Sequence, residues 1–148
     1  MAEHVIFFAF LSLSALLFAL LEIQIEGRHG WAESLPTWRV ENRWTRLIYR
    51  KPVTGYHVYA QAFVLVLSHA PFGLGFAGWG MRPELRVLSF VVLFWLLEDF
   101  LWFACNPAYG VRRFDPESIA WHRDAWWWIA PRDYWIGVPV GLVLYYLA

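Results

Sequence analysis

Four apolar segments dominate the chain, and each approaches the length that a helix needs to cross a membrane. They run from about residue 5 to 23, 56 to 76, 87 to 105 and 134 to 148. A helix needs about 20 mostly apolar residues to cross the hydrocarbon core, so the fourth segment is short by this measure. The pattern predicts an all-α integral membrane four-helix bundle, with residues 1–148 forming a single transmembrane domain.

Two segments between these spans carry a helical pattern of their own. Between residues 37 and 49, arginines recur at spacings of 4, 3 and 4 while apolar residues follow another face. Such a pattern predicts an amphipathic helix at the interface, with its cations toward anionic headgroups. A second helix is predicted from Asp115, a good N-cap followed by Pro116, through the tryptophans of residues 121–128 to Pro131. The arginines of the first segment are Arg39, Arg43, Arg46 and Arg50.

The basic residues predict how the chain is oriented. Ten of the twelve Lys and Arg residues lie in the segments after the first and third spans, whereas the connection between the second and third spans holds Arg82 and Arg86. Loops rich in cations remain in the cytoplasm. We therefore expect a multi-pass protein of the cell membrane, with both termini outside and both amphipathic helices on the cytoplasmic side.

Composition excludes several other classes of protein. The chain is 59% hydrophobic, 20% aromatic and 16% charged, with 11 Trp, whereas soluble domains are about 45–50% apolar and about 25% charged. The formal net charge of zero argues against a nucleic-acid partner. Cys105 is the single cysteine, which excludes an internal disulfide and a Cys-based zinc site. The expected partners are membrane lipids and a hydrophobic small molecule; the sequence leaves open whether the protein is a homo-oligomer.

Acidic and imidazole side chains occur where membrane helices would bury them. Glu98 and Asp99 lie in the third apolar segment, about 10 Å from its cytoplasmic end, a depth at which an unpaired charge costs several kcal/mol. With the predicted topology, further acids and histidines fall at the same membrane face, and we expect them to converge on a cytoplasm-facing cavity. They are Glu22, Glu26, His29, His57, His122 and Asp124.

This cluster could work in two ways, which the sequence leaves open. In the first, which it favours slightly, zinc or iron is bound and activates water or oxygen beside the substrate. Glu26 and His29 have the E-x-x-H spacing of carboxylate-bridged di-metal proteins. In the second, Glu98, Asp99, Glu22 and His57 act without metal, a protonated carboxyl donating a proton that a neighbouring base accepts. The candidate metal ligands are Glu22, Glu26, His29, His57, Glu98 and His122.

The substrate would be bound by aromatic and basic residues. Trp95, Trp102 and Phe103 flank the two acids, and such a wall accommodates a hydrophobic substrate and stabilises positive charge. Arg39 and Arg43 are candidates for holding a polar group of the substrate, such as a phosphate.

Residues 97–103, with the sequence LEDFLWF, resemble the acidic–aromatic motif of the small membrane lycopene cyclases. Leu96 and Leu97 stand where that family usually has a proline before the acids. The resemblance implies that the paired acid protonates a carotenoid end group.

Together these patterns favour a membrane-embedded enzyme of lipid metabolism, acting on a lipid or isoprenoid-like substrate through the carboxylate and histidine cluster. A metal-free acid–base cyclase or isomerase of an isoprenoid or carotenoid is the alternative within that class. A proton- or cation-coupled transporter and a membrane scaffold subunit are alternatives from other classes. A transporter would need polar residues along the whole path, whereas the outer halves of the spans offer few.

Overall fold

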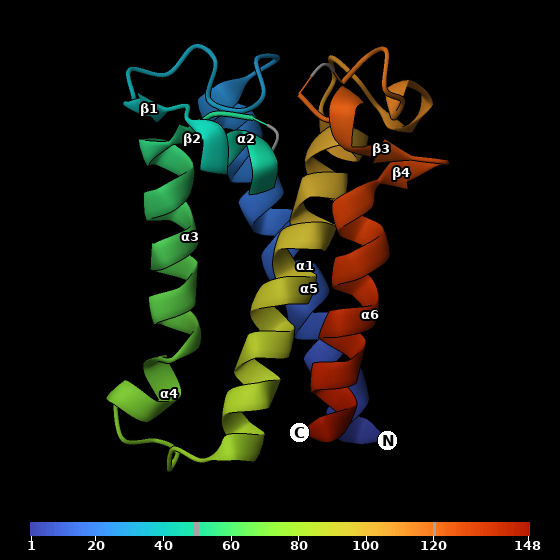
Figure 1. Cartoon of the computed structure of the whole chain (residues 1–148). Helices are drawn as coiled ribbons and strands as arrows, with labels where there is room; N and C mark the ends of the chain where they lie inside the picture. The colour runs from blue at the N-terminus through green and yellow to red at the C-terminus, as the bar shows by residue number, and fades with distance from the viewer. Residues whose placement is uncertain (49–50, 120) are drawn as a thin grey trace.

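The computed structural model describes residues 1–48, 51–119 and 121–148 and is mostly helical (Figure 1). Its long helices are α1 (Ala2–Glu26), α3 (Gly55–Ser68), α5 (Met81–Cys105) and α6 (Arg132–Leu147). Shorter helical segments are α2 (Arg43–Ile48), α4 (Ala70–Gly73), η1 (Val111–Arg113) and η2 (Arg123–Ala125). Two small antiparallel sheets pair β1 (Arg39–Val40) with β2 (Val53–Thr54), and β3 (Trp126–Trp127) with β4 (Ala130–Pro131). The predicted all-α class is confirmed.

Among the described residues, two helices, α1 and α5, are long and apolar enough to cross a membrane. Each has 25 residues and is therefore about 37 Å long. Helix α3 has 14 residues and α6 has 16, which correspond to about 21 Å and 24 Å. Large apolar side chains on the outside of α1, such as Phe10, Leu13 and Leu17, are more than half exposed, as expected of a surface that faces lipid rather than water.

Helices α5 and α6 approach closely through two glycines. A β-carbon on Gly137 would lie 2.6 Å from Cδ1 of Leu96, and one on Gly141 would lie 2.5 Å from Cδ2 of Leu93. This spacing of small residues allows two helices to bring their backbones together. The Ser89 hydroxyl also donates a hydrogen bond of 2.7 Å to the Gly141 carbonyl, so the buried polar groups at the contact satisfy each other.

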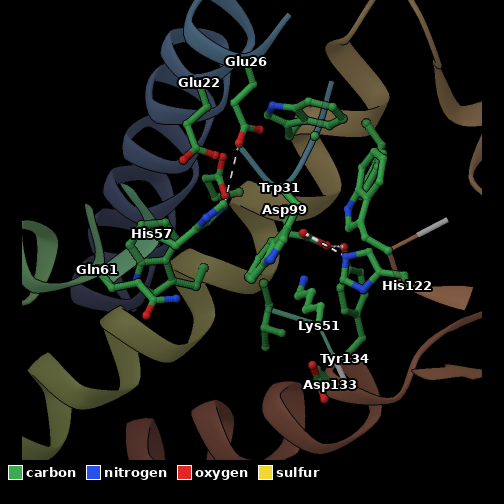
Figure 2. A pocket seen from close by; sticks show the side chains of 17 residues that line it. Glu22, Glu26, Trp31, Lys51, His57, Gln61, Asp99, His122, Asp133 and Tyr134 are labelled. Carbon is green, nitrogen blue, oxygen red and sulfur yellow. Dashed lines mark hydrogen bonds and ion pairs between the residues drawn. The ribbon is translucent and has the colours of Figure 1, made fainter. Parts of the chain in front are cut away.

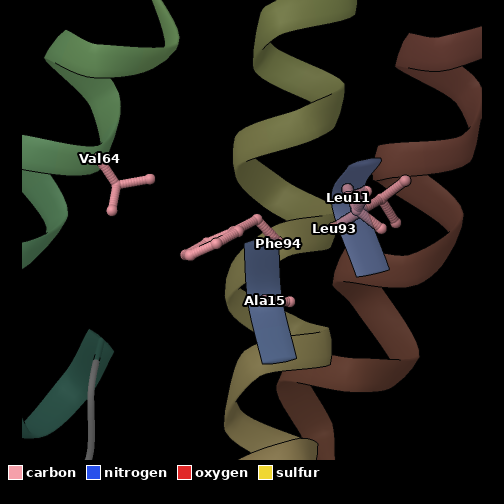
Figure 3. Close-up of a cluster of buried hydrophobic side chains, with 5 residues drawn as sticks. All are labelled: Leu11, Ala15, Val64, Leu93 and Phe94. Carbon is pink, nitrogen blue, oxygen red and sulfur yellow. The ribbon is translucent and has the colours of Figure 1, made fainter. Parts of the chain in front are cut away.

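An apolar cluster fills the middle of the bundle. Leu11 and Ala15 of α1 meet Leu93 and Phe94 of α5, and α3 contributes Val64 (Figure 3). Helix α3 otherwise stands apart from the other three long helices (Figure 1). Its buried residues are Val64, which belongs to this cluster, and Gly55, which packs on the Trp38 ring at the start of the helix.

The segments 27–54 and 106–131, taken without residues 49, 50 and 120, lie together at one end of the bundle, while α4 and both chain termini lie at the other end (Figure 1). Hydrogen bonds join the two segments: Asn106 Nδ2 donates to the Gly27 carbonyl at 2.7 Å, and the Tyr109 hydroxyl donates to the Arg28 carbonyl at 2.9 Å. We call these two segments the cover. The described cations predicted to lie at one membrane face thus share one end of the molecule.

The prediction of a continuous amphipathic helix over residues 37–49 is wrong. Arg39 lies in β1, and the helix begins only at Arg43. Asn42 caps that helix, because its side-chain oxygen accepts the N–H groups of Trp44 and Thr45, and such a cap marks a helix start. Upstream, the chain is held extended by pairing with β2. Tyr49 and Arg50, at the end of this segment, lie outside the described residues.

The predicted helix from Asp115 to Pro131 is also wrong, although its predicted cap is present: residues 116–118 form a turn rather than a helix. Asp115 accepts the N–H groups of Glu117 and Ser118 as a helix cap does. The chain then continues through η2 into the β3–β4 hairpin, because its aromatic residues suit paired strands. Trp127 and Trp128 of this hairpin are exposed. Residue 120 within this range lies outside the described residues.

The boundaries of the second and third apolar segments also differ from the prediction. Helix α3 ends at Ser68 rather than near residue 76, since the Ser68 hydroxyl and the His69 ring bond to carbonyls of the last turn at 2.8 Å and 2.7 Å. Side chains that bond to these carbonyls compete with further helix. Helix α5 begins at Met81 rather than near residue 87.

Candidate functional site

A cavity of about 210 Å³ lies beneath the cover, where the long helices meet the loop end of the bundle (Figure 2). We call it the carboxylate pocket. The predicted catalytic residues Glu22, His57, Glu98 and Asp99 all line it. So do the aromatic residues predicted to contact substrate, Trp95, Trp102 and Phe103, together with Glu26 and His122. Its further lining residues include Trp31, Lys51, Gln61, Leu96, Trp121, Asp133 and Tyr134.

Two carboxyl groups from different helices meet in this pocket. Glu22 of α1 is 5% exposed and Glu98 of α5 is 4% exposed, and their side chains lie within hydrogen-bonding reach of each other. One oxygen of each, Oε1, is buried without a hydrogen-bond partner among the described residues. The Tyr56 hydroxyl also lies within reach of Glu22. The pair therefore combines mutual contact with unused hydrogen-bonding capacity.

The neighbouring acid, Asp99, has a different environment. Its Oδ1 lies 3.3 Å from Nε2 of His122, and its Oδ2 accepts a hydrogen bond of 2.5 Å from the Tyr134 hydroxyl (Figure 2). Adjacent residues on a helix project about 100° apart, which explains why Glu98 turns to α1 while Asp99 turns to His122 and α6. The two adjacent acids therefore have different partners and different environments.

Glu26 and His57 form a second acid–imidazole pair. Glu26 Oε1 lies 3.8 Å from His57 Nε2 and accepts the N–H of Ala32 at 2.5 Å. His57 Nδ1 lies 2.7 Å from the Thr54 hydroxyl, and the ring stacks on Trp31 with centroids 3.9 Å apart. Trp31 and Ala32 have φ of 56° and 53°, a conformation that costs about 1–3 kcal/mol for residues with a β-carbon. The Glu26 bond helps to hold this turn over the pocket.

Lys51 is a pocket residue that sequence reasoning missed. Its Nζ lies 3.3 Å from the centroid of the Trp31 ring, and it occupies the opposite face from His57 because the stack leaves no room between the rings. Burial lowers the pKa of Lys51 from 10.5 to about 8, partly offset by Asp99, Asp133 and Glu26. One feature of the sequence could have pointed to Lys51: it is the single lysine of the chain, whereas the other eleven cations are arginines.

The cover is closed over the pocket by an aromatic contact. Trp121 packs on Gly30, where a β-carbon would lie 2.2 Å from its Cζ2 atom. The Trp121 ring also stacks on Phe103, with centroids 5.9 Å apart, and meets Trp102 edge to face at 6.0 Å. Trp121 of the second cover segment thus packs on Gly30 of the first segment and on Phe103 and Trp102 of the pocket wall, which joins the cover to the pocket.

The arrangement of donors does not suit the predicted zinc or iron. Within the described residues, no three His, Cys, Asp or Glu side chains come together in a way that could hold a metal ion. His57 pairs with Glu26, whereas His122 pairs with Asp99. The E-x-x-H pairing does not form, because His29 is about half exposed and lies 3.5 Å from Glu33 instead. Structural and catalytic zinc sites need three or four convergent protein ligands.

Three further residues of the predicted site lie away from the pocket lining. Arg39 donates to the carbonyls of Thr37 and Ala32, so it supports the cover. Arg43 is exposed at the start of α2, and Asp124 lies in η2. The structure thus does not bring the two arginines to a position where they would hold a substrate phosphate inside the pocket.

Comparison with family models finds no match, and comparisons with curated proteins and with solved structures find no significant similarity. Function is therefore inferred from the pocket's own residues.

Proposed function

We propose that the protein is a membrane-embedded enzyme that moves a proton on a lipid or isoprenoid-like substrate, with Glu22 and Glu98 as the acid–base pair. The observation that carries the proposal is the contact of these two nearly fully buried carboxyl groups in a pocket with indole walls. Two carboxylates in contact in a desolvated site cannot both be ionised without a large penalty. The pair shares one proton, as the two acids of aspartic proteases do.

The surrounding residues have distinct roles in this proposal. Glu98 donates the shared proton to the substrate, and Glu22 accepts a proton from it afterwards. Asp99, which is held by His122 and Tyr134, stabilises positive charge on the substrate. The faces of Trp95 and Trp102 add to this stabilisation. A positioned general acid or base contributes about 10²–10⁴-fold in rate.

The apolar cluster in the middle of the bundle favours an enzyme over a transporter. Leu11, Leu93 and Phe94 lie beyond the pocket along the helices and include no polar group. Among the described residues, the buried polar side chains lie toward the cover, apart from Ser89, which bonds to Gly141. An ion path would need polar groups on both sides of this cluster. A pocket that ends in an apolar floor offers an ion no second exit.

The membrane arrangement that accompanies this function has four spans. Helices α3 and α6 cross beside α1 and α5 and accommodate their shorter length by local thinning of the bilayer. The cations gathered at the cover support a cytoplasmic location for that end, by the positive-inside rule. The pocket then faces the cytoplasm and both termini lie outside the cell membrane, with membrane lipids around the bundle.

Substitution of Glu98 by Gln tests the acid–base pair, because the amide keeps the shape of the side chain and cannot exchange the proton. The matched control is Glu3→Gln, since Glu3 is an exposed acid at the far end of α1. Lipid extracts of cells that produce each variant are compared by mass spectrometry. Proton transfer alone leaves a product that is an isomer of its substrate, so we expect one lipid to be replaced by an isomer in wild type and in Glu3→Gln.

Glu98→Gln and Glu22→Gln should both abolish that replacement while the purified proteins keep their helical content and thermal stability. If both variants fold and give the wild-type lipid profile, the pair has no catalytic role and the enzyme proposal is wrong.

A further inference from the structure

The single lysine of the chain lies in the carboxylate pocket, whereas the other eleven cations are arginines. Arginine remains charged at every accessible pH, whereas a lysine can lose its proton and become a nucleophile when it is buried. Burial brings the pKa of Lys51 to about 8, so a useful fraction of the amine is neutral near neutral pH. The position thus holds the single lysine amine of the chain, a group that can form a C=N bond with a carbonyl.

The charges around Lys51 argue against a simpler role, in which the lysine binds an anionic headgroup by electrostatic attraction. Glu22, Glu26, Glu98, Asp99 and Asp133 all line the same pocket. A phosphate or carboxylate on the substrate would meet these groups as well as the lysine, and like charges brought together in a desolvated site repel strongly. The pocket suits a substrate that arrives neutral and becomes positively charged.

We propose that Lys51 forms an imine with the carbonyl group of an aldehyde or ketone that carries a long apolar chain. The inference rests on the proposed function and names its substrate class. A protonated imine withdraws electrons from the neighbouring carbons, and it therefore makes the C–H groups beside it, or conjugated with it, easier to deprotonate. The acid–base pair then has a substrate on which moving a proton is feasible.

The reaction balances without an oxidant or a reductant. The neutral Lys51 nitrogen forms a bond to the carbonyl carbon, the C=O π bond breaks, and one proton passes from that nitrogen to the carbonyl oxygen, which gives a neutral carbinolamine. A carboxylic acid of the pocket protonates the hydroxyl group, which leaves as water while the nitrogen lone pair forms the C=N bond. The products are one water, a protonated imine and a carboxylate. That carboxylate, with Asp99 and the face of Trp31 beside Nζ, stabilises the cation.

The apolar chain has a place beside the pocket. A groove of about 400 Å³ runs over α1, α5 and α6 and is lined almost entirely by apolar atoms. Leu96 and Tyr134 line both the groove and the carboxylate pocket, so the two are adjacent at these side chains. From there the groove extends along Leu93, Val138 and Leu142 into the part of the bundle expected in the hydrocarbon core. A carbonyl group at Lys51 would leave its chain in this groove.

Reductive trapping tests the imine in the full-length protein. Purified Arg112→Lys protein is incubated with dodecanal and sodium cyanoborohydride near pH 7, digested and analysed by mass spectrometry. Residue 112 is exposed, so its lysine is an internal reference in the same molecule. With a pKa of about 8 against 10.5, the neutral fraction of Lys51 is about 300-fold larger. Because a less basic amine is also a weaker nucleophile, we expect dodecyl labelling of Lys51 to be about tenfold or more faster than that of the reference lysine.

A parallel incubation with propanal, which lacks the long chain, separates amine reactivity from recognition of the chain. Selective labelling by dodecanal, with a weaker preference for Lys51 from propanal, supports the proposal. Selectivity with propanal alone would overturn the long-chain substrate class. Equal labelling of the two lysines with both aldehydes would overturn the imine itself. The lipid profile of Glu98→Gln is measured independently of this labelling. Failure of this inference can therefore be distinguished from failure of the proposed function.

Discussion

Replacing Gly30 by Ala should loosen the cover over the carboxylate pocket. The new β-carbon would lie 2.2, 2.5 and 2.9 Å from three atoms of the Trp121 ring, whereas ordinary contacts begin at 3.4 Å. The ring must therefore withdraw by about 1 Å or more, and a core contact that is overpacked in this way costs about 1–3 kcal/mol. Withdrawal also disturbs the stack of Trp121 on Phe103 and its edge contact with Trp102, and each such aromatic pair contributes about 0.5–1.5 kcal/mol. We expect a total loss of about 2–3 kcal/mol.

The measurement is unfolding of the purified protein in detergent, followed by circular dichroism in the near ultraviolet, where coupled tryptophans give a strong signal. Gly78→Ala is the matched control, because a β-carbon at residue 78 meets no atom within 4 Å. Gly30→Ala should melt at lower temperature and lose near-ultraviolet signal, while Gly78→Ala should match the wild type. Equal melting of the two variants would refute the packing of Trp121 on Gly30.

Two further predictions concern the bundle and the lysine. Gly141→Ala should lower the melting temperature, because its β-carbon would lie 2.5 Å from Leu93; the double variant with Leu93→Ala should recover part of that loss, and no recovery would contradict the close approach of α5 and α6. The pKa of Lys51 is lowered from 10.5 to about 8 on folding, so the unfolded chain binds more protons in that window and the free energy of unfolding should rise between pH 8 and 10.5, by up to about 3 kcal/mol. In denaturant titrations at pH 8 and 10, the free energy of unfolding of Lys51→Met should lack this part of the rise. If that free energy changes with pH equally in the wild type and in Lys51→Met, the prediction is contradicted.

The sequence predicted the features that depend on runs of residues. The helical segments around Ala15 and Phe94 follow from long apolar stretches, because membrane helices satisfy their own backbone groups. The convergence of Glu22, His57 and Glu98 followed from topology, since positions near the same membrane face lie at the same end of a bundle.

The cover could not be predicted in this way. Its path depends on contacts between residues far apart in the sequence, such as Trp38 on Gly55, where a β-carbon would lie 2.4 Å from the indole Nε1. Such a contact favours an extended chain at a place where the arginine spacing favours helix. Lys51 and Tyr134 were missed for the same reason, because neither belongs to a local pattern that points to a pocket. Only the three-dimensional structure brings them beside Asp99.

The loose attachment of α3 affects how a substrate would be supplied to the pocket. The two cover segments are tied by the bonds from Asn106 and Tyr109, whereas the middle of α3 is held to the bundle by Val64. Sideways movement of this middle part leaves the contacts of His57 with Glu26 and Trp31 in place, and we expect an oily molecule to arrive sideways from the bilayer. Its effective concentration would then be set by partitioning into lipid, so turnover would follow the mole fraction in the membrane and would be insensitive to dilution of the aqueous phase.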